Sequence, residues 1–138
     1  MKHFSLKVSV LLLAIACIAF SYPKEKLIEP LKLVEIIQSV TAKKPLILNV
    51  GPEAMIPGAQ LIGVAEDPTN KEKLKTTLKN IPKNKDIVLY CGCCKLVDCW
   101  NIHEADKIAS SLGYTNYKIL NMPTNFNVDW VDKKYPLQ

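Results

Sequence analysis

Four cysteines lie close together in the segment CGCCKLVDC at 91–99. A thiolate is a strong nucleophile and a soft metal ligand, so this spacing indicates sulfur, redox or metal chemistry. Cys91 directly follows the apolar run IVLY, and a helical pattern begins at Asn101. A thiol between a strand and a helix meets backbone N–H groups and the positive end of the helix dipole, which favour the thiolate. We therefore predict that Cys91 is a nucleophile, with an inert buried thiol as the plain alternative.

The roles of the other three cysteines stay open between three chemistries. Cys93 or Cys94 could form a disulfide with Cys99, which an oxidising compartment would allow. One of them could instead resolve a persulfide or sulfenate on Cys91, as part of a thiol redox switch. All four could bind zinc or copper(I), although C-x-C-C-x4-C is no recognised zinc-finger spacing and needs a tightly wrapped loop. We expect no metal and no other cofactor.

Further polar and aromatic residues follow the cysteines. His103, the only histidine of residues 22–138, is a candidate general base or additional metal ligand, with an exposed helix residue as the alternative. Asp98 and Asn101 are interpreted as helix caps. Trp100 and Trp130 are predicted to pack around the site or in the core.

The elements that must position these residues alternate between helix and strand patterns. Apolar residues at helical spacing predict helices at 25–40, 69–80 and 101–112, and short apolar runs predict strands at 46–50, 60–64, 86–90 and 117–120. This alternation implies right-handed crossovers and a parallel sheet with helices on both faces. Functional residues of such sheets lie beyond the carboxyl ends of the strands, where Cys91 falls.

The composition excludes several classes of protein. The 138 residues include 18 basic residues, all of them lysine, against 13 acidic residues, which gives a formal net charge of +5. Without arginine the chain lacks the planar guanidinium that forks onto guanine or phosphate, so neither a sequence-reading nucleic-acid binder nor an arginine-clamped phosphotransferase is expected. The lysines of 71–85 are interpreted as a solvated helix face, and the protein is expected to be a monomer.

Residues 1–21 are predicted to be an export signal. Lys2 and Lys7 precede an apolar stretch at 8–20, and small residues follow. Cleavage would start the mature chain near Tyr22, whereas a lipobox-like sequence at 13–17 would leave Cys17 lipidated, and an uncleaved anchor is a third alternative. Each alternative places the single domain at 22–138 outside the cytoplasm, in the periplasm or as a membrane-anchored lipoprotein. Membrane contact is expected only through such an N-terminal anchor.

Five short segments, in this order, resemble a rhodanese-like (sulfurtransferase) domain over about residues 27–136. They are LILNV at 46–50, IPGA at 56–59, IVLYC at 87–91, LGY at 112–114, and Trp130 with YP at 135–136. The resemblance implies a three-layer α/β fold with an approximately five-stranded, mostly parallel sheet and helices on both faces.

The resemblance also implies an activity. In such a domain Cys91 would accept sulfane sulfur from a small anionic donor as a persulfide and pass it to a thiol or cyanide-like acceptor. The donor and the charged sulfur would be bound by the loop of Gly92, Cys93, Cys94 and Lys95.

The chain departs from the family pattern at several positions. The usual aspartate and arginine after the first core strand are replaced by Asn49 and Gly51. The usual loop is a short C-x-x-G-x-R, whereas this loop is longer, resembles a C-G-C-C subgroup of small exported members, and has Lys95 as its only cation. A lysine makes a point contact where arginine would fork. The alternative function is therefore a non-catalytic module that uses the four cysteines for metal binding or thiol-disulfide exchange.

Overall fold

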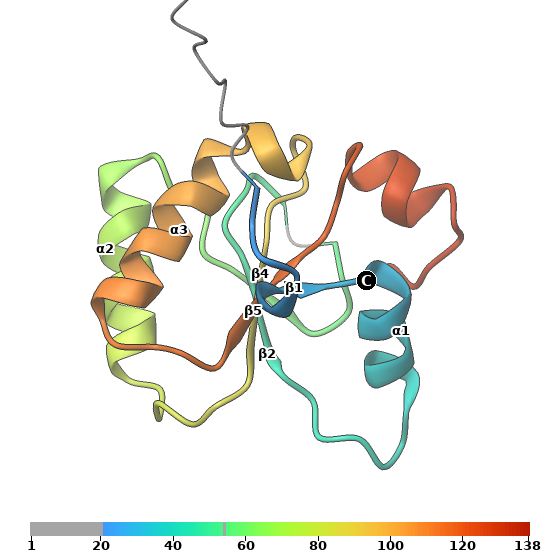
Figure 1. Ribbon diagram of the computed structural model, residues 1–138, viewed down its shortest axis with the longest axis horizontal. Helices are drawn as coiled ribbons and strands as arrows, with labels where there is room; N and C mark the ends of the chain where they lie inside the picture. Colours follow the sequence, from blue (N-terminus) through green and yellow to red (C-terminus); the bar gives the residue numbers. More distant parts are fainter. Residues whose placement is uncertain (1–20, 54) are drawn as a thin grey trace, which may run out of the picture.

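The computed structural model describes residues 21–53 and 55–138 (Figure 1). Nearly all of the predicted export signal, including the lipidation candidate Cys17, lies outside the described residues. Within them, none of the helices has the length and apolar character needed to span a membrane.

The centre of the fold is a sheet of five parallel strands in the order β1-β5-β4-β2-β3. The strands are β1 (Leu27–Ile28), β2 (Leu46–Asn49), β3 (Ala59–Leu61), β4 (Ile87–Tyr90) and β5 (Tyr117–Leu120). Every pairing is parallel. Parallel neighbours start at the same end of the sheet, so a crossover segment must return the chain to that end between strands. The predicted α/β class with five strands is confirmed, and the sheet is entirely parallel.

Helices cover both faces of this sheet. They are α1 (Pro30–Gln38), α2 (Pro68–Lys79), α3 (Trp100–Ser111), the 3-10 turns η1 (Lys24–Lys26) and η2 (Leu96–Asp98), and the π-helix η3 (Asn127–Val131). Figure 1 shows α2 and α3 on one side of the sheet, with α1 and the red C-terminal helix on the other. The three layers expected from the sequence are therefore present.

The predicted helix at 25–40 is wrong in its first part. Residues 24–28 form η1 and then β1, and the helix begins at Pro30. Proline has a fixed φ and no N–H, so it is tolerated in the first turn of a helix but not inside one. Leu27 and Ile28, just before Pro30, are extended and pair with Ile119 and Leu120 at the edge of the sheet.

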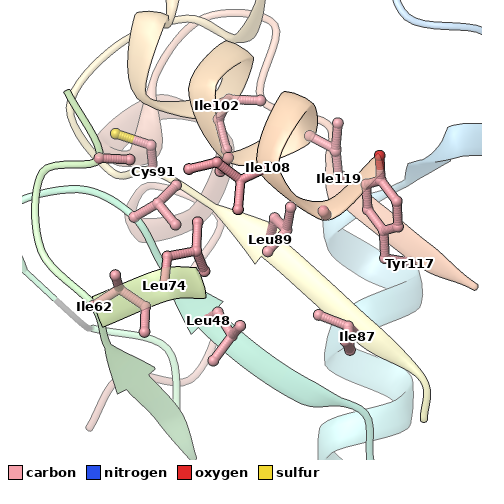
Figure 2. Close-up of a cluster of buried hydrophobic side chains, with 14 of the residues drawn as sticks. Leu48, Ile62, Leu74, Ile87, Leu89, Cys91, Ile102, Ile108, Tyr117 and Ile119 are labelled. Carbon is pink, nitrogen blue, oxygen red and sulfur yellow. The ribbon is translucent and has the colours of Figure 1, made fainter. Parts of the chain in front are cut away.

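Two hydrophobic clusters fill the spaces between the layers. The cluster beneath α2 and α3 includes the labelled residues of Figure 2, among them Leu74, Leu89 and Ile102. The cluster beneath α1 contains Trp130, which is fully buried and donates a hydrogen bond from Nε1 to the carbonyl oxygen of Pro136 at 2.9 Å. The prediction that Trp130 packs in the core is confirmed.

The central strand β4 is buried along its whole length and leads directly into the cysteine segment. It lies between β2 and β5, and Asn49 is in register with Tyr90 at its carboxyl end. Cys91 therefore follows a central strand whose residues are all buried.

Candidate functional site

The candidate site is a cluster of four thiols beyond β4. Cys91 follows the strand, Cys93 and Cys94 lie on the loop, and Cys99 is the N-terminal cap residue of α3. Their four sulfur atoms all lie within 4.8 Å of one another. The loop is thus wrapped as tightly as a common site for all four cysteines requires.

The four thiols differ in their exposure. Cys91 and Cys99 are each 1% exposed, whereas Cys94 is half-buried and Cys93 is exposed. Figure 2 shows Cys91 among the apolar side chains beneath α3. The cluster therefore has two anchored sulfurs in the core and two sulfurs at the surface.

Cys93 is the loop cysteine that contacts Cys91 directly. The two Sγ atoms are 3.0 Å apart, and the Sγ atoms of Cys93 and Cys94 are 3.1 Å apart. All four cysteines are free thiols in the structure. Of the two loop cysteines that could resolve a persulfide or sulfenate on Cys91, Cys93 is the one in direct contact with its sulfur.

The cluster concentrates negative charge on Cys91. A hydrogen bond from Cys99, followed by hydrogen bonds from the side chain and backbone of Cys93 and from Asn101, lowers the pKa of the Cys91 thiol to about 5. Burial, together with the bonds to Cys91 and Cys94, raises the pKa of Cys93 to about 12. Donation to Cys91 also raises the pKa of Cys99. The arrangement is one thiolate surrounded by protonated thiols that donate to it.

Asn101 has a different role from the predicted helix cap. The α3 N-terminus has no side-chain cap, and Asn101 is 7% exposed. Its Nδ2 donates to the sulfurs of Cys91 at 3.6 Å and Cys93 at 3.8 Å, while its Oδ1 accepts from the backbone N–H of Glu66 at 3.1 Å. Asn101 therefore holds its amide dipole toward the thiolate.

A sequence signal for this role of Asn101 does exist. Asn101, Ala105 and Ile108 share the buried face of α3, so a polar residue stands where the pattern requires an apolar one. Buried amides need hydrogen-bond partners, and the partners here are the thiols.

Asp98 does not cap α3 either. Its carboxylate forms an ion pair with Lys95 at 2.8 Å, and both side chains are more than half exposed. This contact raises the pKa of the Lys95 ammonium. The predicted anion-binding lysine therefore lies at the rim of the site, with its charge directed at a carboxylate.

Gly51 is a site residue whose role the sequence pattern did not reveal. A Cβ atom at this position would lie 2.7 Å from the Sγ of Cys91 and 3.2 Å from the backbone nitrogen of Gly92. No side chain fits there unless the thiol moves. A side chain at position 51 would therefore displace the Cys91 sulfur or the backbone of Gly92.

His103 lies beside the cysteine loop, but its nitrogens are not part of the ligand-atom cluster found among residues 21–53 and 55–138. Its ring is half-buried between Tyr22 and Trp100, with centroid separations of 5.8 and 5.9 Å. Trp100 is 69% exposed and, with Val97, Asp98 and His103, lines an open hollow of about 420 Å³. Trp100 therefore lies near the site as predicted, but it contacts His103 at the surface and most of its side chain is exposed.

Comparisons with known proteins bear on the fold. No protein-family model matches the chain, and no curated protein does either. A solved full-length protein from Lactobacillus plantarum aligns at a TM-score of 0.59 and 16% identity, over 83% of this chain and 88% of the other. EanB, solved as a variant in complex with hercynine, aligns at a TM-score of 0.54 and 19% identity, over 82% of this chain and 27% of EanB.

At these identities the likeness shows the fold alone. The fold and the site together define a small three-layer α/β protein with a cluster of four thiols at the carboxyl edge of its sheet. This placement matches the position where parallel sheets bind ligands.

Proposed function

We propose that this protein is a rhodanese-like sulfurtransferase that carries sulfane sulfur as a persulfide on Cys91. The observation that carries the proposal is the position of Cys91 at the end of the central strand, with its pKa lowered to about 5 by the donors around it. A thiolate at neutral pH is the form that attacks a sulfur donor. The order of the rhodanese-like segments along the parallel sheet supports the same function.

The chemistry consists of two displacements at sulfur. The Cys91 thiolate attacks the outer sulfur of a donor such as thiosulfate, which gives the Cys91 persulfide anion and releases sulfite. An acceptor thiolate or cyanide then attacks the outer sulfur of the persulfide and takes it up, which gives a new persulfide or thiocyanate. The Cys91 thiolate is the leaving group and is regenerated. Each step breaks one sulfur–sulfur bond with its electron pair, so no external oxidant is needed.

The groups around Cys91 suit an anionic persulfide. Asn101 directs an N–H toward the sulfur, and the backbone of Cys93 donates to the same atom. The helix α3 adds the positive end of its dipole. Fixed donors of this kind stabilise charge without reorganisation during the reaction.

Access to Cys91 requires movement of the loop at 92–95. The thiol is 1% exposed, and the space between Cys91, Cys94 and Cys99 is too narrow to admit a water molecule. A small hollow of about 60 Å³, lined by Glu53, Gly92 and Phe126 among others, borders the loop at Gly92. We propose that a small donor enters from this side and that Lys95 attracts it once its contact with Asp98 opens.

The location of the protein is part of the same proposal. The signal-like residues 1–21 support export to the periplasm, either as a free protein or as a lipoprotein anchored through Cys17. The proposed partners are therefore a small anionic sulfur donor and a thiol or cyanide-like acceptor in that compartment.

The proposal is tested by intact-mass measurement after thiosulfate treatment. Reduced, chelator-treated wild type should gain one sulfur atom, whereas Cys91→Ser should gain none. Circular dichroism of both proteins controls for folding. Absence of any adduct in folded wild type, or an equal adduct in Cys91→Ser, would contradict the proposal.

A second experiment tests the role of Lys95. Lys95→Ala should raise the donor concentration needed for half-maximal loading, because it removes the only cation of the loop. Asp98→Asn should lower that concentration, because it frees the Lys95 ammonium from its ion pair. Identical loading curves for the two variants would exclude Lys95 from donor binding.

A further inference from the structure

The four sulfur atoms lie closer together than persulfide transfer on a single thiol requires. Cys93 and Cys99 donate to the Cys91 thiolate, but the persulfide chemistry gives Cys94 no role, and yet all four sulfur atoms lie within 4.8 Å of one another. A tetrahedral site with metal–sulfur bonds of about 2.3 Å places its sulfurs about 3.8 Å apart. The separations in the cluster span this value: the Cys91–Cys93 and Cys93–Cys94 pairs are 3.0 and 3.1 Å apart, and no pair is more than 4.8 Å apart.

The loop can close the remaining difference with small movements. Cys91 and Cys99 are fixed by β4 and by the start of α3, and both are buried in the core. Cys93 and Cys94 lie between them on the loop, and the backbone N–H of Leu96 is fixed to the carbonyl oxygen of Met122 at 2.9 Å. Opening the Cys91–Cys93 and Cys93–Cys94 pairs to the tetrahedral separation takes about 0.7–0.8 Å each. Two ligands are thus preorganised and two are adjustable.

The surroundings suit a site with net negative charge. Four thiolates around a divalent ion leave a charge of −2, which needs donors in an outer shell. Asn101 Nδ2 points at Cys91 and Cys93, and the backbone N–H of Ile102 donates to Cys99. The N-terminus of α3, a helix of 12 residues, adds its positive dipole end. The ligand-atom cluster contains no carboxylate that would repel the thiolates.

We propose that Cys91, Cys93, Cys94 and Cys99 form a tetrahedral all-thiolate site for one thiophilic metal ion, with Zn²⁺ as the best chemical match. Four soft sulfur donors select Zn²⁺ over hard cations, and the coordination shell they form is closed. Binding replaces the thiol protons by metal–sulfur bonds and releases those protons to solvent. The site goes beyond persulfide transfer, and the two states exclude each other because both use the Cys91 sulfur.

Metal titration of the reduced protein under anaerobic conditions tests the site. Zn²⁺ should bind at one ion per chain and protect the four thiols from a thiol-counting reagent. Co²⁺ should give the visible absorption of a tetrahedral thiolate complex, which Zn²⁺ then displaces. Neither readout involves sulfur transfer, so failure of this site and failure of the proposed function are distinguishable.

Variants assign the ligands. Cys94→Ser should abolish the tetrahedral Co²⁺ spectrum, and Asn101→Ala should weaken Zn²⁺ binding by about 10- to 100-fold as an outer-shell change. Val97→Ser, an exposed position on the same loop, is the matched control and should bind as wild type does. No Zn²⁺ or Co²⁺ binding by folded wild type, an unchanged spectrum in Cys94→Ser, or binding of copper(I) alone would each overturn the proposal.

Discussion

The charge state of Cys91 can be tested through the hydrogen bond that contributes most to it. Cys99 is the largest cause of the lowered Cys91 pKa, which is about 5. At pH 6 a thiol with this pKa is about 90% ionised, whereas an ordinary thiol with a pKa near 8.5 is about 0.3% ionised. The surroundings of Cys91 therefore raise its thiolate fraction about 300-fold at that pH.

Two replacements of Cys99 separate the effect of its hydrogen bond on Cys91 from the effect of its side-chain volume. Cys99→Ala removes the donor, so the midpoint of Cys91 ionisation should rise toward the ordinary value and the thiolate fraction at pH 6 should fall. Cys99→Ser keeps a hydroxyl donor at the same position and should retain most of the lowered pKa. Alanine and serine are similarly small, so any cavity affects both variants alike. A difference between the two variants therefore reports the loss of the hydrogen-bond donor.

The assay follows Cys91 ionisation in reduced, metal-free protein from pH 4 to pH 10. Thiolate absorbance in the ultraviolet reports ionisation without requiring access, and iodoacetamide labelling with peptide mass spectrometry assigns the signal to Cys91. Burial lowers the labelling rate at every pH but leaves the midpoint in place. A wild-type midpoint above about pH 8, or the same midpoint in Cys99→Ala, would refute the reasoning.

The remaining predictions concern stability and the shape of the site. The free energy of unfolding of the reduced protein should rise between pH 5 and about pH 8.5, because Cys91 has a lower pKa folded than unfolded, and it should fall above that range because the pKa of Cys93 is raised to about 12. Urea titrations at several pH values check this, and an equal rise in Cys91→Ser would contradict it. Gly51→Ala should cost about 1–3 kcal/mol by pushing the Cys91 sulfur out of place, whereas Gly92→Ala, whose added Cβ would meet only ordinary contacts at 3.8 Å, is the control for stability. Denaturant midpoints that are equal for these two variants would rule out the steric argument. Tyr90→Phe should cost about 1–3 kcal/mol, because the Tyr90 hydroxyl accepts from two backbone N–H groups at 2.9 and 3.2 Å, and a loss below the error of the titration would show that water replaces it.

The sequence alone was sufficient for most of the fold. Apolar runs of four or five residues predicted the inner strands, since a parallel strand covered on both faces must be apolar throughout. Helical spacing predicted α2 and α3 within a residue at each end. The strand β1 was missed because it has only two residues, and its pairing with β5 depends on a segment almost a hundred residues away.

The identity of the candidate site also follows from the sequence, but its internal order does not. A strand that ends in Cys91 and a helix that starts near Asn101 place the thiols at the carboxyl edge of the sheet. Spacing along the chain could not show that the Cys93 sulfur lies 3.0 Å from that of Cys91, or that Lys95 pairs with Asp98. Those contacts depend on side-chain directions in an irregular loop, which no periodicity encodes.

The tertiary structure alone decided how the cluster is charged. Cys99 and Asn101 reach Cys91 only because α3 packs against β4, and Gly51 makes room for the sulfur only because β2 and β4 are neighbours. Residue types determine that the chain can form a thiolate or bind a soft metal. The distances between those residues, which arise from the packing of strands and helices far apart in sequence, decide which thiol is ionised and whether four sulfurs can share one ion.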